Sequence, residues 1–315
     1  MSKEKKPEIN ILSGFLGSGK TTLLQRLLKN EETRKRKVGV IMNEIGQVSI
    51  DSAAIPENTP LKELLNGCVC CTLSDKLEVQ MYDLLENHNL DVVYIETTGV
   101  AHPLEVLDAC LSPLLADKIN IGTIISVINA SGWSNRHSFK RPLQKLITEQ
   151  AKHADVIVLN KVDLISDEKQ EEVMNELHAL NQKGKIVTAE FTNIDVNSMT
   201  VRKTSKDTAR EKVHATEHLH IKTYVHTFEN PVNKNRFEEF LRNMPENIYR
   251  IKGYIRFEGD PATFLFQYAY GVPYHTNAGI KMKELLVFIG DELDHEVLRK
   301  LLLQLEHDLP PNVTC

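Results

Sequence analysis

Two short stretches of the sequence carry side chains whose types and spacing could do chemistry. The first, GFLGSGKTT at residues 14–22, fits the P-loop pattern G-x-x-x-x-G-K-[ST]. In a P-loop the glycines let backbone N–H groups converge on phosphate oxygens, because no Cβ atom intervenes. Lys20 would reach the β- and γ-phosphates, and the Thr21 hydroxyl would ligate Mg²⁺. The residues expected to bind nucleotide here are Gly14, Gly17, Ser18, Gly19, Lys20, Thr21 and Thr22.

The second stretch, LNGCVCCTL at residues 65–73, holds three of the five cysteines of the chain, Cys68, Cys70 and Cys71. Thiolates are soft ligands that suit Zn²⁺, Cu⁺ and related ions and disfavour Mg²⁺ and Ca²⁺. Three thiolates leave one position of a tetrahedral zinc site open, which suits a protein that passes its metal on. Candidates for the fourth ligand are Glu44, Asp75, Glu78, a histidine and water. A closed structural zinc site and a redox-active trio of thiols are the alternatives.

The sequence NKVD at residues 160–163 follows an apolar run, so it is expected at the end of a buried strand. An ionised Asp163 would accept hydrogen bonds from guanine N1–H and the 2-amino group. Adenine has a lone pair at N1 and no 2-amino group, so it would be rejected. Lys161 could lay its aliphatic stem along the base. Asn160, Lys161 and Asp163 therefore predict recognition of guanine, and hence of GTP rather than ATP.

An acidic residue, Glu96, ends the apolar run 92–95 and begins the sequence ETTG. P-loop proteins hold Mg²⁺ with an acid in this place, usually through water. The N–H of Gly99 could meet a γ-phosphate, which would hold a switch segment that relaxes on hydrolysis. A glutamate that only caps the strand is the alternative. The expected catalytic residues are Lys20, Thr21 and Glu96.

The elements around these motifs predict how they are positioned. Apolar runs alternate with helical patterns over the first two-thirds of the chain, which predicts a mostly parallel sheet with helices on both faces. Ligands of such folds bind at the carboxyl ends of the strands, where all three nucleotide motifs fall. The expected strands are 9–12, 38–42, 92–95, 121–128, 156–159 and 185–188, and the expected helices are 72–87, 103–111, 141–152 and 167–181.

The composition changes near residue 192, where the chain becomes polar and loses its periodicity. The expected parts are a P-loop GTP-binding domain at 1–192, a linker at 193–217 and a small α+β domain at 218–315. The second domain shows strand patterns at 219–227, 249–257, 263–270 and 284–289 and helical patterns at 233–243 and 294–306. Within the linker, His214, His218 and His220 could bind zinc weakly, and a solvated linker is the alternative.

The bulk composition limits the class of protein. The chain has 315 residues, of which 41% are hydrophobic and 26% charged, and a formal net charge of −5. This balance argues against a nucleic-acid partner, and no stretch approaches the roughly 18 apolar residues of a membrane span. The first ten residues lack the apolar run of a signal peptide. We expect a cytoplasmic protein, without a membrane partner, whose clustered thiols stay reduced.

Several motifs in fixed order make the chain resemble the CobW-like GTPases, particularly the YjiA-type branch of that family. They are GFLGSGKTT, NEIGQVSID, NGCVCC, ETTG and NKVD, and YRIKGYIRF at 249–257 resembles a strand of the family's second domain. The resemblance covers the entire chain. It implies a P-loop GTPase domain with a mostly parallel sheet, followed by a CobW-type α+β C-terminal domain. It also implies GTP hydrolysis coupled to the handling of zinc, cobalt or another transition metal.

The same resemblance assigns roles to single residues. It makes the three clustered cysteines the internal metal site and puts Glu44 in a switch segment between nucleotide and thiolates, as a further metal ligand. Asp51 would lie nearby, as an expected Mg²⁺ ligand. The guanine-contacting loop after the last strand is expected at TAEFTN, residues 188–193. Three positions depart from the family pattern: Gln47 stands where a glutamate is frequent, Met42 where some members have an acid, and His102 where an aspartate is common.

These observations together predict a slow GTPase that binds a transition metal, most readily zinc, at the C-x-C-C site and transfers it to a client protein. The client would bind through the C-terminal domain, and a nucleotide-dependent homodimer could supply a residue that stimulates hydrolysis. The expected cofactors are GTP, Mg²⁺ and Zn²⁺, or another transition metal such as Co²⁺. Two alternatives are a P-loop small-molecule kinase with structural zinc, and a redox or metal-binding module that nucleotide only stabilises.

Overall fold

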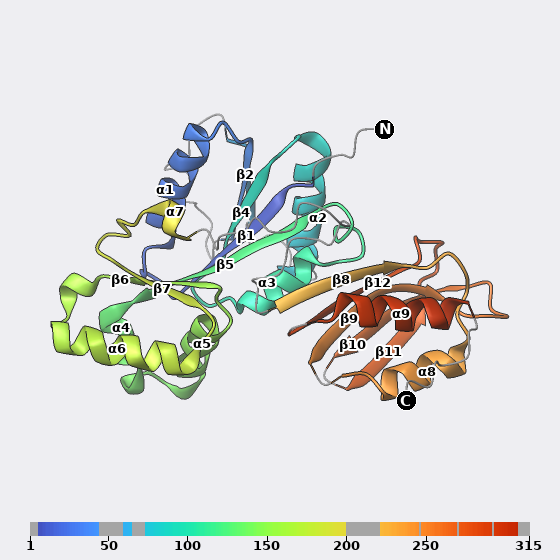
Figure 1. The fold of residues 1–315 in the computed structure, drawn as a ribbon. Helices are drawn as coiled ribbons and strands as arrows, with labels where there is room; N and C mark the ends of the chain where they lie inside the picture. The colour runs from blue at the N-terminus through green and yellow to red at the C-terminus, as the bar shows by residue number, and fades with distance from the viewer. Residues whose placement is uncertain are drawn as a thin grey trace. The chain divides into compact units, whose positions relative to one another are not determined.

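The structure is a computed structural model and describes residues 6–43, 59–64, 73–199, 221–245, 247–269, 271–291 and 293–307. Its chain divides into two compact units, which are described separately (Figure 1). The first unit contains Met1–Cys110 and Lys118–His220, and the second contains Leu111–Asp117 and Ile221–Cys315. The short segment Leu111–Asp117 therefore groups with the second unit, although it lies within the stretch expected to form the first domain.

A seven-stranded sheet forms the centre of the first unit, in the order β3-β2-β4-β1-β5-β6-β7 (Figure 1). Every pair of neighbouring strands is parallel, which confirms the predicted fold class. The strands are β1 Glu8–Ser13, β2 Val38–Asn43, β3 Leu61–Leu64, β4 Val92–Glu96, β5 Asn120–Asn129, β6 Val156–Asn160 and β7 Lys185–Ala189. The chain starts in the middle of the sheet and continues to both sides of β1, so a ligand crevice is expected at the carboxyl end of β1.

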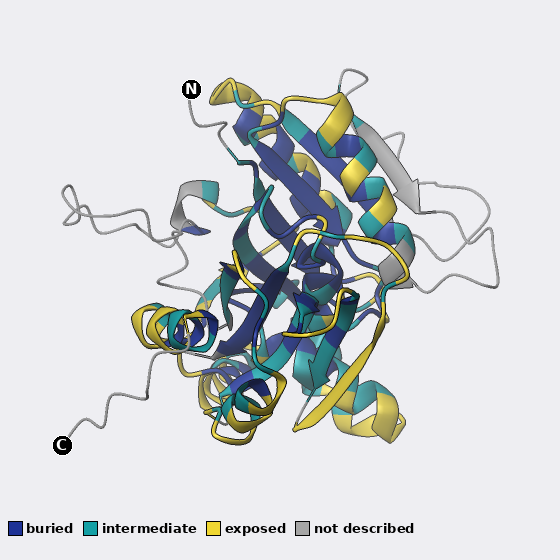
Figure 2. Cartoon of the chain, turned by 90° about the vertical axis from the view of Figure 1, so that its right-hand side faces the viewer, coloured by how far each residue is buried: buried dark blue, intermediate teal, exposed yellow. Residues whose placement is uncertain are grey.

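The helices of the first unit follow the predicted alternation with strands. They are α1 Lys20–Thr33, α2 Leu73–Asn87, α3 Pro103–Cys110, α4 Ala130–Ser134, α5 Arg141–Lys152, α6 Asp167–Leu180 and α7 Val196–Met199. Local sequence fixes where some of them begin. The hydroxyl of Ser166 accepts a hydrogen bond from the backbone N–H of Lys169 and so caps α6. In Figure 2 the helices carry buried residues on their inner sides and exposed residues on their outer sides.

Two hydrophobic cores, one on each face of the sheet, hold this unit together. Val156 and Val158 of β6 belong to the core that contains the leucines of α1. Ile157 and Leu159 of the same strand belong to the core that contains residues of α5 and α6. The split follows from the alternation of side chains along a strand. A strand that is apolar on both faces thus explains why the run before NKVD is continuously hydrophobic.

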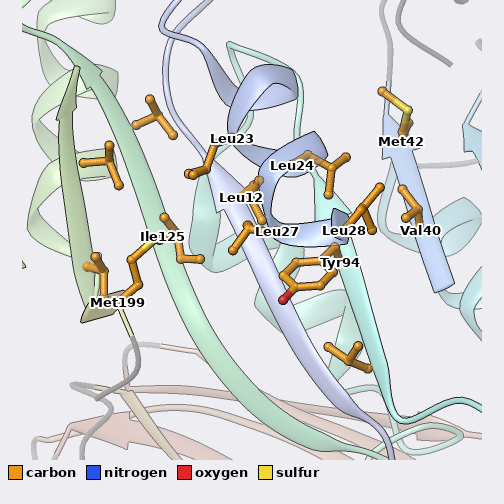
Figure 3. Close-up of a cluster of buried hydrophobic side chains, with 14 of the residues drawn as sticks. Leu12, Leu23, Leu24, Leu27, Leu28, Val40, Met42, Tyr94, Ile125 and Met199 are labelled. Carbon is orange, nitrogen blue, oxygen red and sulfur yellow. The ribbon is translucent and has the colours of Figure 1, made fainter. Parts of the chain in front are cut away.

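The core beneath α1 positions the P-loop. Its members include Leu12 of β1 and Leu23, Leu24, Leu27 and Leu28 of α1 (Figure 3). Full burial of a leucine contributes roughly 1.5–3 kcal/mol relative to exposure, so this face of α1 is firmly held. Because α1 begins at Lys20, the packing also fixes the end of the P-loop.

The second unit is a small α+β domain, as predicted. Its five strands pair antiparallel in the order β11-β10-β9-β12-β8. The strands are β8 Ile221–Thr227, β9 Ile248–Arg256, β10 Thr263–Ala269, β11 Val272–Asn277 and β12 Leu285–Asp291, and the helices are α8 Lys234–Arg242 and α9 His295–Glu306. Phe237, Phe266 and Phe288 are fully buried between helices and sheet. All residues of the edge strand β11 are exposed, and the strand is yellow throughout in Figure 2.

None of the helices in the described part of the chain combines the length and the apolar character needed to cross a membrane.

Cys110 is the one cysteine within the described residues, and it is fully buried at the end of α3. Burial, together with the nearby carboxylate of Asp108, raises the pKa of its thiol to about 12. The thiol is therefore neutral and packed as a small apolar side chain.

Cys110 should resist alkylation in the folded protein. Iodoacetamide at mildly alkaline pH is expected to modify it only after denaturation, because the reagent needs an accessible thiolate. Peptide mapping by mass spectrometry would report this cysteine separately from the other four. Rapid labelling of Cys110 under native conditions would contradict the burial described above.

Candidate functional site

The P-loop connects β1 to α1 through three glycines with positive φ. The φ angles are 137° at Gly14, 70° at Gly17 and 110° at Gly19, in the region that glycine adopts without strain. A Cβ on Gly14 would lie 2.2 Å from the carbonyl oxygen of Val127, and one on Gly19 would lie 2.6 Å from Nδ2 of Asn160. The loop can therefore close against the ends of β5 and β6 only with glycine at these positions.

Lys20 and Ser18 supply polar groups to the interior of this loop. Lys20 Nζ donates to the carbonyl oxygens of Gly14 at 2.9 Å and Phe15 at 3.4 Å, so the ammonium lies within the loop. The Ser18 hydroxyl is buried and has no hydrogen-bond partner among the described residues. No side chain caps the N-terminus of α1 at Gly19, so its first N–H groups are directed at whatever the loop binds. These features fit a phosphate group.

Thr21 and Glu96 meet although they lie far apart in the sequence. The Thr21 hydroxyl donates to Glu96 Oε1 at 2.7 Å. The contact forms because β1 pairs with β4, which brings the P-loop next to the end of β4. A hydroxyl and a carboxylate are oxygen ligands of the kind that Mg²⁺ prefers. Two of the three predicted magnesium residues, Thr21 and Glu96, are thus adjacent, and their chemistry fits the ion.

The segment after Glu96 contacts the P-loop. The backbone N–H of Ala101 donates to the carbonyl of Thr98 at 3.1 Å, which closes a four-residue turn from Thr98 to Ala101. A Cβ on Gly99 would lie 2.5 Å from the backbone nitrogen of Leu16. The turn and the P-loop therefore touch through their backbones, as a phosphate-sensing switch requires.

His102, where the family pattern has aspartate, contacts α5 rather than the P-loop. Its Nε2 lies 3.8 Å from Oε2 of Glu149, and the same oxygen lies 2.9 Å from Nε2 of His153. The backbone N–H of Leu104 donates to His102 Nδ1 at 3.3 Å. Burial lowers the pKa of His153, although its hydrogen bond to Glu149 opposes the shift. The segment after β4 is therefore anchored to α5 at this point.

Asn160 connects the loops that surround the predicted base site. Its side chain is buried and donates to the carbonyl of Ser18 at 2.8 Å. Its Oδ1 accepts from the N–H of Thr192, also at 2.8 Å. Lys161 follows with a φ of 61°, and Asp163 is exposed just beyond it. All three predicted guanine residues thus lie at the carboxyl end of β6, beside the P-loop.

The loop after β7 lies within the guanine-contacting loop expected at residues 188–193, and it has an unusual backbone conformation. Phe191 and Thr192 have φ angles of 50° and 54°, although neither is glycine. Thr192 is buried, whereas Phe191 is 74% exposed. Arg26 of α1 holds the loop by donating to Asn193 Oδ1 at 3.1 Å and to the carbonyl of Phe191 at 3.3 Å. No pattern in the sequence indicates the strained backbone of this loop, because neither residue with a positive φ is a glycine.

The predicted transition-metal residues, Cys68, Cys70, Cys71 and Glu44, lie outside the described residues, as do Asp51 and the cluster His214, His218 and His220. Within the described ranges, no group of three or more histidine, cysteine or acidic side chains is arranged to hold a metal ion. The neighbouring strands are informative, because Met42 pairs with Glu96 across β2 and β4. The carboxyl end of β2 therefore lies beside Glu96.

A parallel sheet that presents a phosphate loop, an acid beside the P-loop threonine and an NKVD sequence at one edge defines a P-loop GTPase. The chain belongs to the CobW/HypB/UreG family: the profile of the CobW/HypB/UreG nucleotide-binding domain matches residues 8–209. The profile of the cobalamin synthesis protein cobW C-terminal domain matches residues 221–306. The family predicted from the order of the motifs is thus confirmed.

Known relatives span much of the chain. The zinc chaperone YjiA of Escherichia coli (strain K12) is 29% identical, over 92% of this chain and 96% of the relative. The zinc-regulated GTPase metalloprotein activator 1 of Dictyostelium discoideum is also 29% identical, over 58% of this chain and 46% of that protein. The crystal structure of Zn(II)-bound YjiA GTPase from E. coli is similar with a TM-score of 0.48 and 24% identity, over 95% of this chain and 99% of that one.

The contact between Gly99 and Leu16 predicts the effect of one methyl group. Gly99→Ala should force the turn and the P-loop apart, because the new Cβ would meet backbone rather than a flexible side chain. We expect a loss of about 1–3 kcal/mol in the free energy of unfolding and weaker nucleotide binding. Chemical denaturation and calorimetric titration with GDP would measure both.

Gly132→Ala is the matched control, since a Cβ there would have ordinary contacts at 3.5 Å. It should leave stability and nucleotide affinity close to those of the wild type. A Gly99→Ala variant as stable as this control, with unchanged affinity, would contradict the proposed backbone contact.

Proposed function

We propose that this chain is a GTP-hydrolysing metallochaperone that binds a transition metal, most readily zinc, at Cys68, Cys70 and Cys71 and couples GTP hydrolysis to metal transfer. The observation that carries the proposal is the pairing of Met42 with Glu96, because it places the end of β2 beside the carboxylate expected at the nucleotide. The three cysteines follow β2 in the sequence. The names of the relatives, a zinc chaperone and a zinc-regulated GTPase metalloprotein activator, support zinc as the metal.

Different residues would bind different parts of the Mg²⁺–GTP complex. Lys20 and the N-terminus of α1 would compensate the charge of the β- and γ-phosphates. Thr21 and Glu96 would hold Mg²⁺, with Asp51, which lies outside the described residues, as a further ligand, and the ion would neutralise charge on the phosphate oxygens during hydrolysis. Gly99 would offer its N–H to the γ-phosphate. Loss of that phosphate would release the turn after β4 and would change the switch segment expected around Glu44.

The proposed division of labour follows the expected domains. Residues 1–192 would bind GTP and metal, and residues 218–315 would take part in binding the client metalloprotein. Residues 193–217 would be the linker between these two domains. We expect slow intrinsic turnover, because no arginine finger is evident in the sequence. A residue from the client or from a second copy of the chain in a nucleotide-dependent dimer would then speed hydrolysis.

Guanine selection should depend on the carboxylate of Asp163. In Asp163→Asn, an amide group would face the N1–H and 2-amino donors of guanine, so GTP affinity should fall by about 100-fold. Xanthosine triphosphate, which has a carbonyl at position 2, should bind the variant better than GTP. Asp167→Asn, at another exposed aspartate nearby, is the control and should keep GTP preference. Equal GTP affinity in Asp163→Asn and wild type would rule out this mode of base recognition.

Coupling between metal binding and nucleotide binding is tested by titrating reduced, metal-free protein with Zn²⁺ against a competing chelator. The zinc affinity should differ between GDP and a non-hydrolysable GTP analogue by at least about fivefold, and zinc must shift GTP affinity by the same factor. Cys70→Ser should abolish tight binding, whereas Cys110→Ala, outside the motif, should not. Tight zinc binding that ignores the nucleotide would identify a structural zinc site and refute the chaperone cycle.

A further inference from the structure

Gln150 is a buried polar residue that the proposed GTP site does not use. It lies on α5 and is 1% exposed. Its side-chain Nε2 donates to the carbonyl oxygens of Gly99 at 3.3 Å and of Ala101 at 3.1 Å. A single buried amide therefore holds two peptide groups of the turn that follows Glu96.

The first of these peptide groups is the middle one of the turn. The turn runs from Thr98 to Ala101 and is closed by the hydrogen bond between its ends. Its middle peptide consists of the Gly99 carbonyl and the Val100 N–H. Because a trans peptide is planar, these two groups point in opposite directions. Gln150 holds the carbonyl towards α5, so the Val100 N–H must point away from α5.

The orientation of this peptide decides which polar atom the turn offers to a ligand. A γ-phosphate would be attracted by an N–H group and repelled by a carbonyl oxygen. Rotation of the middle peptide by half a turn would exchange the two groups and convert one turn type into another. Gln150 opposes that rotation, because it would leave the buried amide without the Gly99 carbonyl.

Val100 adds an independent restraint. The rotated turn would need a positive φ at its third residue, which a β-branched side chain adopts only with strain. Among the described residues, the non-glycines with positive φ are Lys35, Lys161, Phe191 and Thr192, so Val100 has the ordinary conformation. Its side chain is 54% exposed, so burial of Val100 does not fix the turn.

We propose that Gln150 is a positioning residue that locks the peptide between Gly99 and Val100, so that its N–H rather than its carbonyl faces the γ-phosphate of GTP. GDP lacks this phosphate but shares the remaining contacts of the P-loop. The hydrogen bond from Gln150 to this peptide should therefore raise the affinity for GTP and should have little effect on the affinity for GDP. The inference rests on the proposed function, namely binding of GTP at the P-loop.

A purely structural role is the competing explanation, and Asn181 provides a matched control for it. Asn181 is 4% exposed and also donates from one amide to two carbonyls, those of Ala151 at 3.0 Å and Ala154 at 2.8 Å. These carbonyls follow Gln150 in the sequence but do not belong to the turn. Loss of the Asn181 amide should lower stability without changing how the turn presents its N–H groups.

The test compares Gln150→Met with Asn181→Leu, since each replacement removes the amide and puts an apolar side chain of similar size in its place. Calorimetric titration with Mg²⁺ would give the affinity for GDP and for a non-hydrolysable GTP analogue in each variant. In Gln150→Met, the affinity for the analogue should fall by about tenfold, while that for GDP changes by less than about twofold. In Asn181→Leu, the melting temperature should fall and the ratio of the two affinities should stay within about twofold of wild type.

A second pair of variants keeps the test valid if Gln150→Met does not fold. Val100→Gly removes the restraint on φ at an exposed position and should lower affinity for the GTP analogue relative to GDP. Val100→Ala removes most of the side chain but still disfavours a positive φ, so it should stay closer to wild type.

The outcomes separate this inference from the proposed function. Wild-type protein that binds neither nucleotide would refute the GTP site itself. Wild-type protein that binds both, together with an unchanged ratio in Gln150→Met and Val100→Gly, would overturn only the positioning role. Equal losses for GDP and the GTP analogue in Gln150→Met would also overturn it, because they would indicate a structural contribution alone.

Discussion

The two hydrogen bonds of the buried Asn160 side chain hold together the loops of the proposed GTP site. One bond reaches the P-loop at Ser18, and the other reaches Thr192 in the loop after β7. Gly19 must lack a side chain because Asn160 occupies that space. A residue first identified as part of a base-recognition sequence therefore also acts as a connector between strand ends. Such a buried amide is costly to leave unsatisfied, so the loops keep one arrangement.

The turn after β4 is restrained by the same kind of interaction. Backbone atoms of Gly99 approach the P-loop, and side chains of α5 hold the opposite side of the segment through Gln150 and Glu149. The hydrophobic cores on the two faces of the sheet fix α1 and α5 independently. The segment between them is thus held from both sides by fixed elements, which is the arrangement that the proposed switch needs.

The sequence predicted those parts of the molecule in which local chemistry limits the choice of residues. The P-loop, Glu96 and NKVD follow apolar runs, and the structure has strands there with the expected order of elements. The edge strand β11 was not predicted, because all of its residues are exposed and no alternation marks it. Gln150 gave no signal either, since its partners are carbonyl oxygens of a distant segment. The metal site at the clustered cysteines stays a prediction, because those residues lie outside the described ranges.

Lys20 has a consequence for the thermodynamics of the nucleotide site. Its ammonium group already donates to carbonyl oxygens of its own loop. A phosphate that binds there exchanges one set of acceptors for another, so the number of hydrogen bonds at Lys20 changes little. The gain must then come from bringing opposite charges together rather than from new hydrogen bonds. Affinity at this loop should accordingly weaken as ionic strength rises, to the extent that the bound phosphates remain accessible to solvent ions.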